Sequence, residues 1–167
     1  GNLIRITNDP FGLAIAPNGK KAVTLHNGVF TVIDLAALTH TRVPGYNKTI
    51  NSPLTHSPVG GNEPVQALPH KVIESALPKG SFLGVAFAAD SKTVYWSGGD
   101  NGAVIVYDIE NFKRLDSISL NGKVDGAEFD DSFTSDLLLN NDELLILDRG
   151  NFRLVRYDLT HKKITAS

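Results

Sequence analysis

Four short strand-forming segments, separated by tight turns, follow one another between Ser81 and Leu120. The predicted strands are 85–89, 93–96, 103–109 and 114–120. The polar residues 90–92 separate the first two, and the glycine-rich stretch 98–102 can supply the positive φ angles of a second tight turn. This order of strands and turns predicts a four-stranded antiparallel meander of about forty residues.

The same pattern recurs on both sides of this stretch. An aspartate ends the third strand of each copy, at Asp34, Asp108 and Asp158, and it marks the register of the repeat. The three copies span about 9–43, 70–120 and 133–165. An irregular, proline-rich segment at about 44–69 separates the first copy from the second. We also expect outer strands at 3–7 and 70–75. The whole chain, 1–167, is therefore predicted to form one repetitive domain.

The repeats resemble the YVTN-type β-propeller repeat in two stretches, FGLAIAPNGKKAV at 11–23 and VFTVIDL at 29–35. A third stretch, SFTSDLLLNNDELLILDRGNFRLVRYDLTHKKI at 132–164, is similar to blades of bacterial propeller–phosphoesterase fusion proteins. The predicted fold class is all-β, a partial β-propeller of three to four four-stranded antiparallel blades. The resemblance also implies an exported protein, periplasmic or secreted.

A closed propeller contains about four to eight blades of roughly forty residues, whereas three blades are assigned in this sequence. An open end would leave unpaired strand edges, which favour pairing with another chain or segment. We therefore expect the remaining blades to come from another chain or another segment.

Net charge and composition argue against several kinds of partner, cross-link and metal site. The 16 basic and 18 acidic residues give a net charge of −2, so we expect no nucleic-acid binding. The chain has no cysteine, which excludes disulfides and thiolate metal sites. No apolar run approaches the roughly 18 residues of a membrane span, so none is expected. No cofactor is predicted.

The best candidate site is the face where the loops between second and third strands meet those that connect successive blades, since propellers commonly bind ligands there. The candidate ligand-binding residues are His26, Asn27, Lys79, Asp100, Asn101, Asp148, Arg149 and Asn151. The alternative is that these are solvated turn residues, because Asn, Asp and Gly favour turns on conformational grounds alone.

Carboxylates cluster after the second repeat, and oxygen ligands of this kind suit hard cations. We predict no metal site, however, because the spacing matches no calcium-binding loop and Phe129 and Phe133 indicate local packing. The four weak candidates are Asp125, Glu128, Asp130 and Asp131.

Other repeated residues have structural interpretations. The marker aspartates are expected to accept backbone N–H groups of the following turn, and Trp96 is expected in the core between blades with Phe87, Tyr95 and Tyr107. With no convergent catalytic set in the sequence, we predict a non-catalytic scaffold that binds protein or a small-molecule ligand. The alternatives are the propeller portion of a hydrolase, either a phosphoesterase or a metal-assisted enzyme, and a self-assembling structural module.

Overall fold

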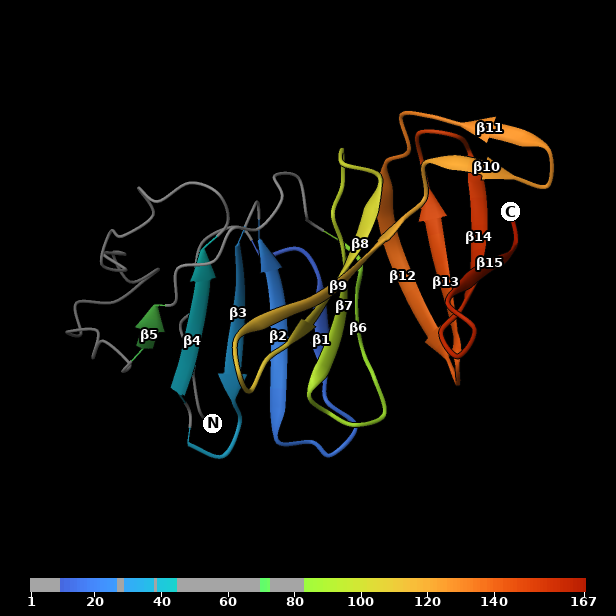
Figure 1. Cartoon of the computed structure of the whole chain (residues 1–167). Coiled ribbons are helices and arrows are strands. Elements are labelled where there is room, and N and C mark those ends of the chain that lie inside the picture. The colour runs from blue at the N-terminus through green and yellow to red at the C-terminus, as the bar shows by residue number, and fades with distance from the viewer. Residues whose placement is uncertain (1–9, 27–28, 38, 45–69, 73–82) are drawn as a thin grey trace.

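The structure is a computed structural model that describes residues 10–26, 29–37, 39–44, 70–72 and 83–167. Within these ranges every regular element is a β-strand, and the sheets stand beside one another as successive layers (Figure 1). The predicted all-β partial propeller is thereby confirmed. The strand expected at 3–7 and residues 45–69 of the irregular segment lie outside the described residues. Among the described residues, no helix is long and apolar enough to cross a membrane.

Blade 1 is an antiparallel meander formed by the first repeat. Its strands are β1 (Leu13–Ile15), β2 (Lys21–His26), β3 (Val29–Asp34) and β4 (Thr39–Pro44). A fifth strand, β5 (His70–Val72), pairs with β4 in the parallel direction. An outer strand was predicted at 70–75, and its described part, β5, forms the outer edge of the first sheet.

Blades 2 and 3 are four-stranded antiparallel meanders with the same strand order. Blade 2 contains β6 (Val85–Phe87), β7 (Thr93–Ser97), β8 (Ala103–Asp108) and β9 (Lys113–Ser119). Blade 3 contains β12 (Thr134–Asn140), β13 (Glu143–Asp148), β14 (Arg153–Asp158) and β15 (Lys163–Ala166).

A small hairpin lies between blades 2 and 3. Its strands, β10 (Gly122–Val124) and β11 (Ala127–Phe129), pair only with each other among the described strands. Asp125 and Gly126 join them with positive φ angles of 50° and 89°, as a two-residue hairpin turn of the primed type requires. The hairpin projects beyond the end of blade 3 (Figure 1).

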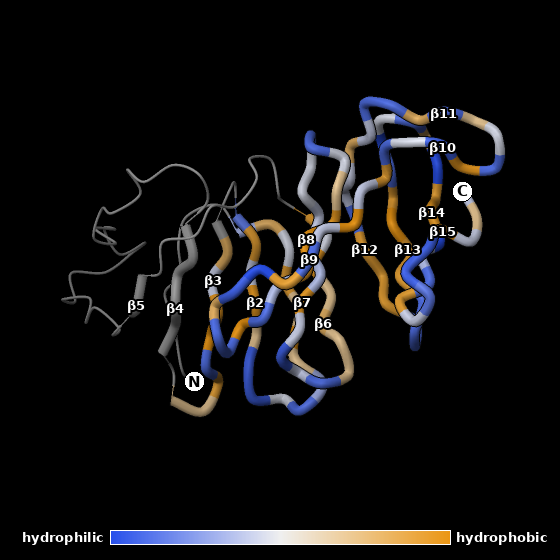
Figure 2. Tube along the Cα trace, viewed as in Figure 1, coloured by the Kyte–Doolittle hydropathy of each residue, from blue (hydrophilic) through white to orange (hydrophobic). Residues whose placement is uncertain are grey.

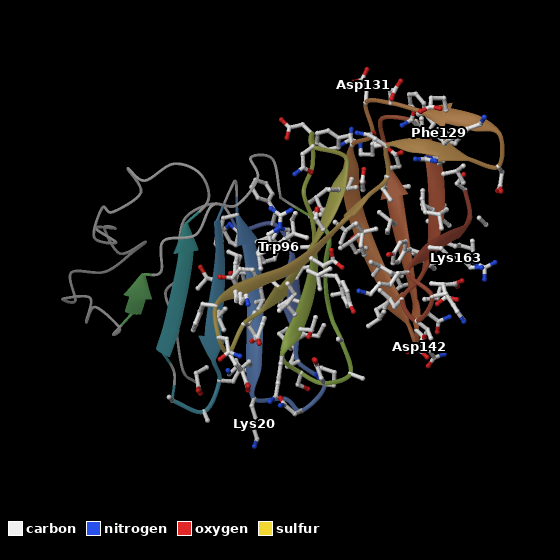
Figure 3. All side chains as sticks on the ribbon, in the orientation of Figure 1. Lys20, Trp96, Phe129, Asp131, Asp142 and Lys163 are labelled. Carbon is white, nitrogen blue, oxygen red and sulfur yellow. The ribbon has the colours of Figure 1, made fainter. Side chains whose placement is uncertain are left out.

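Two hydrophobic cores hold the blades together. Between blades 1 and 2, Phe30 packs against Trp96 and Tyr107 at ring-centroid distances of 4.5 and 5.1 Å, and Trp96 lies well inside the molecule (Figure 3). Between blades 2 and 3, Val104 belongs to a buried cluster with Leu137 and others. Tyr95 packs on this second side, as the alternation of side chains along β7 requires. Both cores are interfaces between blades, as predicted.

The marker aspartates cap the turns that follow the third strands, as predicted. Asp34 Oδ1 accepts the N–H groups of Ala36 and Ala37 at 3.0 and 2.8 Å. Asp108 Oδ1 accepts two N–H groups in the same way, at 2.8 and 2.9 Å, and Asp158 Oδ1 accepts that of His161 at 2.8 Å. These hydrogen bonds hold the pKa values of Asp108 and Asp158 below their ordinary value, for Asp108 against the opposing effect of burial.

Candidate functional site

Two hairpin turns meet the chain segment that enters blade 3. Thr134 N–H donates to the Gly99 carbonyl at 3.1 Å, and Gly99 N–H donates to Thr134 Oγ1 at 3.0 Å, which ties the β7–β8 turn to the start of β12. Arg149 N–H donates to the Phe133 carbonyl at 2.8 Å, which ties the β13–β14 turn to the same segment. We call this region, with the β10–β11 hairpin, the loop end; Figure 3 shows Phe129 and Asp131 here and Asp142 at the opposite end of blade 3.

Asp148 is the centre of the loop end and is fully buried. Its Oδ1 accepts the N–H groups of Phe133 and Gly150 at 2.9 and 3.1 Å, and its Oδ2 accepts Arg153 Nε–H at 2.9 Å. Burial alone would raise the pKa of Asp148, but the hydrogen bonds from Arg153, Phe133 and Asn151 outweigh it and hold the pKa below its ordinary value. The carboxylate is therefore a charged, fully engaged structural acceptor.

Arg153 links this carboxylate to the neighbouring blade. Its guanidinium Nη2 donates to the Leu120 carbonyl at 2.6 Å, at the end of blade 2. The Phe129 ring of the hairpin lies over the guanidinium, with 3.6 Å between Cζ and the ring centroid, a cation–π contact. Arg153 is only 8% exposed. One side chain thus joins blade 2, the hairpin and blade 3.

Asn151 completes this arrangement. Its Nδ2 lies 3.0 Å from the Asp130 carbonyl oxygen, 3.0 Å from Ser132 Oγ and 3.1 Å from Asp148 Oδ2. We refer to Asp148, Arg153, Asn151 and Ser132 as the polar cluster. It fixes the segment before β12 to the β13–β14 turn.

Gly150 shows how closely these two segments approach. A Cβ atom at this position would lie 2.1 Å from the Asp131 carbonyl oxygen and 2.9 Å from the Phe133 nitrogen. No side chain fits there without displacing backbone, so the turn needs glycine for space.

The other candidate ligand residues are not members of the polar cluster. His26 is 2% exposed in blade 1, with Nε2 at 2.9 Å from Thr24 Oγ1 and 3.3 Å from Thr31 Oγ1. Asn101 Oδ1 accepts the N–H of Ala103 at 3.1 Å within its own turn. Asp100 and Arg149 are exposed, while Asn27 and Lys79 lie outside the described residues. Ligand binding by these eight residues remains a prediction.

The weak metal candidates lie on the hairpin and the segment after it. Asp125, Glu128, Asp130 and Asp131 are all exposed. In the part of the chain that the structure describes, no group of three or more His, Cys, Asp or Glu side chains is placed to hold a metal ion. The carboxylates instead give the loop end a negative, solvated surface.

An open hollow of about 610 Å³ borders the loop end. It is lined by Phe133, Leu147, Asp148, Arg149, Gly150 and Phe152. The Arg149 guanidinium lies 5.8 Å from the Phe133 ring centroid, and Phe152 is 96% exposed. The hollow is therefore mainly apolar with one cation at its rim.

Sequence reasoning did not single out Arg153 or Ser132, and it assigned Phe129 only to local packing. One available signal was the hairpin register, because Asp148 and Arg153 face each other across the β13–β14 turn, where opposite charges attract. The contact of Phe129 with Arg153 carries no such signal, since it joins separate hairpins.

Comparisons with known proteins agree with this geometry at the level of fold. No protein-family model matches the sequence, and no curated protein sequence matches it significantly. Similar solved structures include U3-55K, with a TM-score of 0.63 and 9% identity over 99% of this chain and 41% of that chain. The WD40 repeats of RRP9 give a TM-score of 0.59 and 9% identity over 99% and 40% of the two chains. Hydrazine synthase of Kuenenia stuttgartiensis gives 0.57 and 13% over 98% and 38%.

These likenesses identify the fold as that of a β-propeller. The chain spans about two-fifths of the length of each of these three structures. At 9–13% identity the likeness shows the fold alone. The three blades correspond to part of a propeller.

Proposed function

We propose that the chain is part of a non-catalytic β-propeller scaffold that binds other proteins at its loop end. One observation carries the proposal: the β10–β11 hairpin interrupts the regular blade order, has exposed side chains along it, and is fixed at its base by Phe129 against Arg153. Binding elements are often added to rigid scaffolds in this form.

The rigid base favours binding because it reduces the conformational entropy lost on association. The polar cluster holds residues 130–133 through hydrogen bonds to Asp148 and Asn151. The hairpin is therefore connected to an anchored segment, so the exposed residues of the hairpin are held in position before a partner binds.

The exposed charges indicate the chemistry of the partner. Four carboxylates are exposed on or beside the hairpin, whereas the same residues 122–131 contain a single lysine, Lys123. The carboxylates are those of Asp125, Glu128, Asp130 and Asp131. A protein surface that presents lysine or arginine would be attracted to this end, and association would weaken with added salt.

A charge reversal tests the proposal. The variants Glu128→Lys and Asp130→Lys keep the backbone contacts of the hairpin, and Asp142→Lys, exposed at the opposite end of blade 3, is the matched control. Proteins that co-purify with the wild type and with Asp142→Lys should be lost from both loop-end variants, as quantified by mass spectrometry. If the same proteins remain bound to all four, the loop end is not the binding surface.

Three finer features remain part of the proposal and rest on the resemblance of the repeats. We propose a YVTN-type propeller, an exported protein, and relation to the propeller part of the phosphoesterase fusions. Cell fractionation of the source organism tests the location.

The rival function, the propeller portion of a hydrolase, is tested by incubating the purified chain with a panel of phosphoesters and lactones. Turnover that Asp100→Ala or His26→Ala abolishes would replace the scaffold proposal.

A further inference from the structure

A groove of about 230 Å³ lies between blades 2 and 3, and none of its lining residues belongs to the loop end. Its apolar lining consists of Tyr95, Val106, Leu115, Ile118, Tyr157 and Leu159. All of these except Leu115 belong to the hydrophobic core between blades 2 and 3 or pack against it. The groove is therefore the place where that core reaches the surface, so an apolar group bound there would extend an existing interface.

Leu115 has a position in the groove that contact between the blades does not require. The register of β8 with β9 shifts between Val106 and Tyr107, which leaves Leu115 as the extra residue of a β-bulge. Leu115 is 51% exposed, and along β9 the colour changes between hydrophilic and hydrophobic (Figure 2). Blade 3 has a bulge at the same place, where the extra residue is Thr165. A polar residue thus serves the bulge in blade 3, and blade 2 alone adds an exposed leucine there.

The strand edge beside the groove suits an extended segment. β9 is the outermost strand of its sheet, and β8 is its only paired neighbour in the described part of the chain. In blade 1 the corresponding strand, β4, pairs with the three-residue strand β5 in the parallel direction. The outer edge of a blade in this fold thus accepts a short extended segment. Side chains alternate along such a segment, so one of them would point toward the groove.

The volume of the groove fits one side chain rather than a whole small molecule. Pockets for small ligands usually enclose about 300–1,000 Å³, whereas a cavity of about 150 Å³ holds a benzene ring. The groove, at about 230 Å³, lies between these limits. A single leucine, phenylalanine or similar large apolar side chain is therefore a suitable occupant.

The two charged residues of the groove form a weak ion pair. Lys162 Nζ lies 3.6 Å from Asp116 Oδ2, and the side chains are 73% and 52% exposed, so solvent screens their attraction. Asp116 Oδ1 also accepts the N–H group of Ser117 at 2.8 Å. An incoming carboxylate can therefore replace Asp116 beside Lys162 without leaving Asp116 unpartnered.

The charges along β9 favour an acidic occupant. Lys113, Arg114 and Lys162 are exposed on β9 and at the groove, where Asp116 is the only carboxylate among the residues of β9 and the groove lining. Asp158, in the strand before Lys162, is already paired with His161 at 2.8 Å. The groove thus combines an apolar pocket with an excess of positive charge at its mouth.

We propose that this groove binds an extended, acidic segment of a partner protein. The segment inserts one large apolar side chain beside Leu115 and places a carboxylate beside Lys162, while its backbone runs along the free edge of β9. This interaction goes beyond protein binding at the loop end. The two surfaces share no residue, so either can fail while the other holds.

Peptide selection tests the proposal on the full chain. A phage-displayed library of random heptapeptides is selected on the wild type and depleted on Leu115→Asp, which places a charge in the groove. The selected peptides should share a large apolar residue that has an aspartate or glutamate next to it or one residue away. A selection that yields no peptide, or peptides without this pattern, would overturn the proposal.

Fluorescence anisotropy with a selected peptide then measures each contact. Leu115→Asp should weaken binding about tenfold or more, because the apolar contact is lost. The matched control Thr165→Asp, at the same bulge position of blade 3, should bind like the wild type. Lys162→Glu should weaken binding as well, and a peptide whose acidic residue is replaced by lysine should bind this variant better than it binds the wild type.

Circular dichroism verifies the fold of each variant, and Leu115→Ala takes the place of Leu115→Asp if the latter does not fold. Equal binding by the variants at positions 115 and 165 would show that Leu115 does not contact the peptide. A lysine peptide that binds Lys162→Glu no better than the wild type would remove the contact with Lys162. Either result overturns the proposal.

Discussion

Replacement of Asp148 by alanine should destabilise the chain far more than the loss of another ion pair in the same blade. Asp148 is fully buried and Arg153 is 8% exposed, so the variant leaves a buried guanidinium without its counter-charge. The N–H groups of Phe133 and Gly150 also lose their acceptor. Removal of one partner from a buried pair costs about 3–5 kcal/mol of unfolding free energy.

Arg156→Ala is the matched control. Its ion pair with Glu143 is of similar length, 2.7 Å, but the two side chains are 54% and 26% exposed. Solvent screens such a pair, so its loss should cost less than about 1 kcal/mol.

Urea denaturation at neutral pH measures both effects. Fluorescence of Trp96, the single tryptophan, reports on the core between blades 1 and 2, and far-ultraviolet circular dichroism reports on all sheets. The double variant Asp148→Ala/Arg153→Ala should lose less than the sum of the two single losses, since it leaves no unpaired buried charge. If Asp148→Ala costs no more than Arg156→Ala, the structural role assigned to the polar cluster is wrong.

The pH dependence follows from the lowered pKa of Asp148. A group whose pKa is lower in the folded state contributes stability above its unfolded pKa, near 3.8, and loses it as the pH falls through the folded value. The wild type should therefore lose stability over this acid range, whereas Asp148→Asn, less stable at neutral pH, should lose less of its remaining stability there. If the stability of the two proteins fell equally over this acid range, Asp148 would not be the group whose lowered pKa stabilises the folded chain.

Three further substitutions have expected outcomes in the same denaturation assay or by circular dichroism. Trp96→Ala should cost about 3–5 kcal/mol, because this fully buried ring fills the core between blades 1 and 2. Gly150→Ala should cost about 1–3 kcal/mol, since its Cβ would lie 2.1 Å from the Asp131 carbonyl oxygen. Asp108→Ala should cost about 1 kcal/mol through the loss of its turn hydrogen bonds. A neutral result at any position would remove the role proposed for that residue.

Sequence reasoning could identify the blades because the information is local. The period-two alternation of β7 and the turn aspartates Asp34, Asp108 and Asp158 specify strands and turns within one repeat. Since the two faces of a blade follow from this alternation, the placement of Trp96 and Tyr95 on opposite sides of blade 2 could also be predicted from the sequence.

The rest depends on contacts between segments that are distant in sequence. β5 has three residues, and its parallel partner β4 lies some thirty residues earlier, so no local pattern specifies the pairing. The residues of the β13–β14 turn have the composition of a solvated turn, and only the close approach of residues 130–133 buries Asp148. His26 likewise resembles a loop residue until Thr24 and Thr31 are placed beside it.

The central claim is that the repeats pack as successive blades in chain order. A spin label at Asn18→Cys tests this by paramagnetic broadening of amide signals, because the chain has no other cysteine. Asn18 N–H lies 3.1 Å from Ser91 Oγ, so we expect strong broadening in the turn around Ser91 of blade 2 and little around Asn141 of blade 3. Broadening around Asn141 with unaffected signals around Ser91 would contradict the blade order.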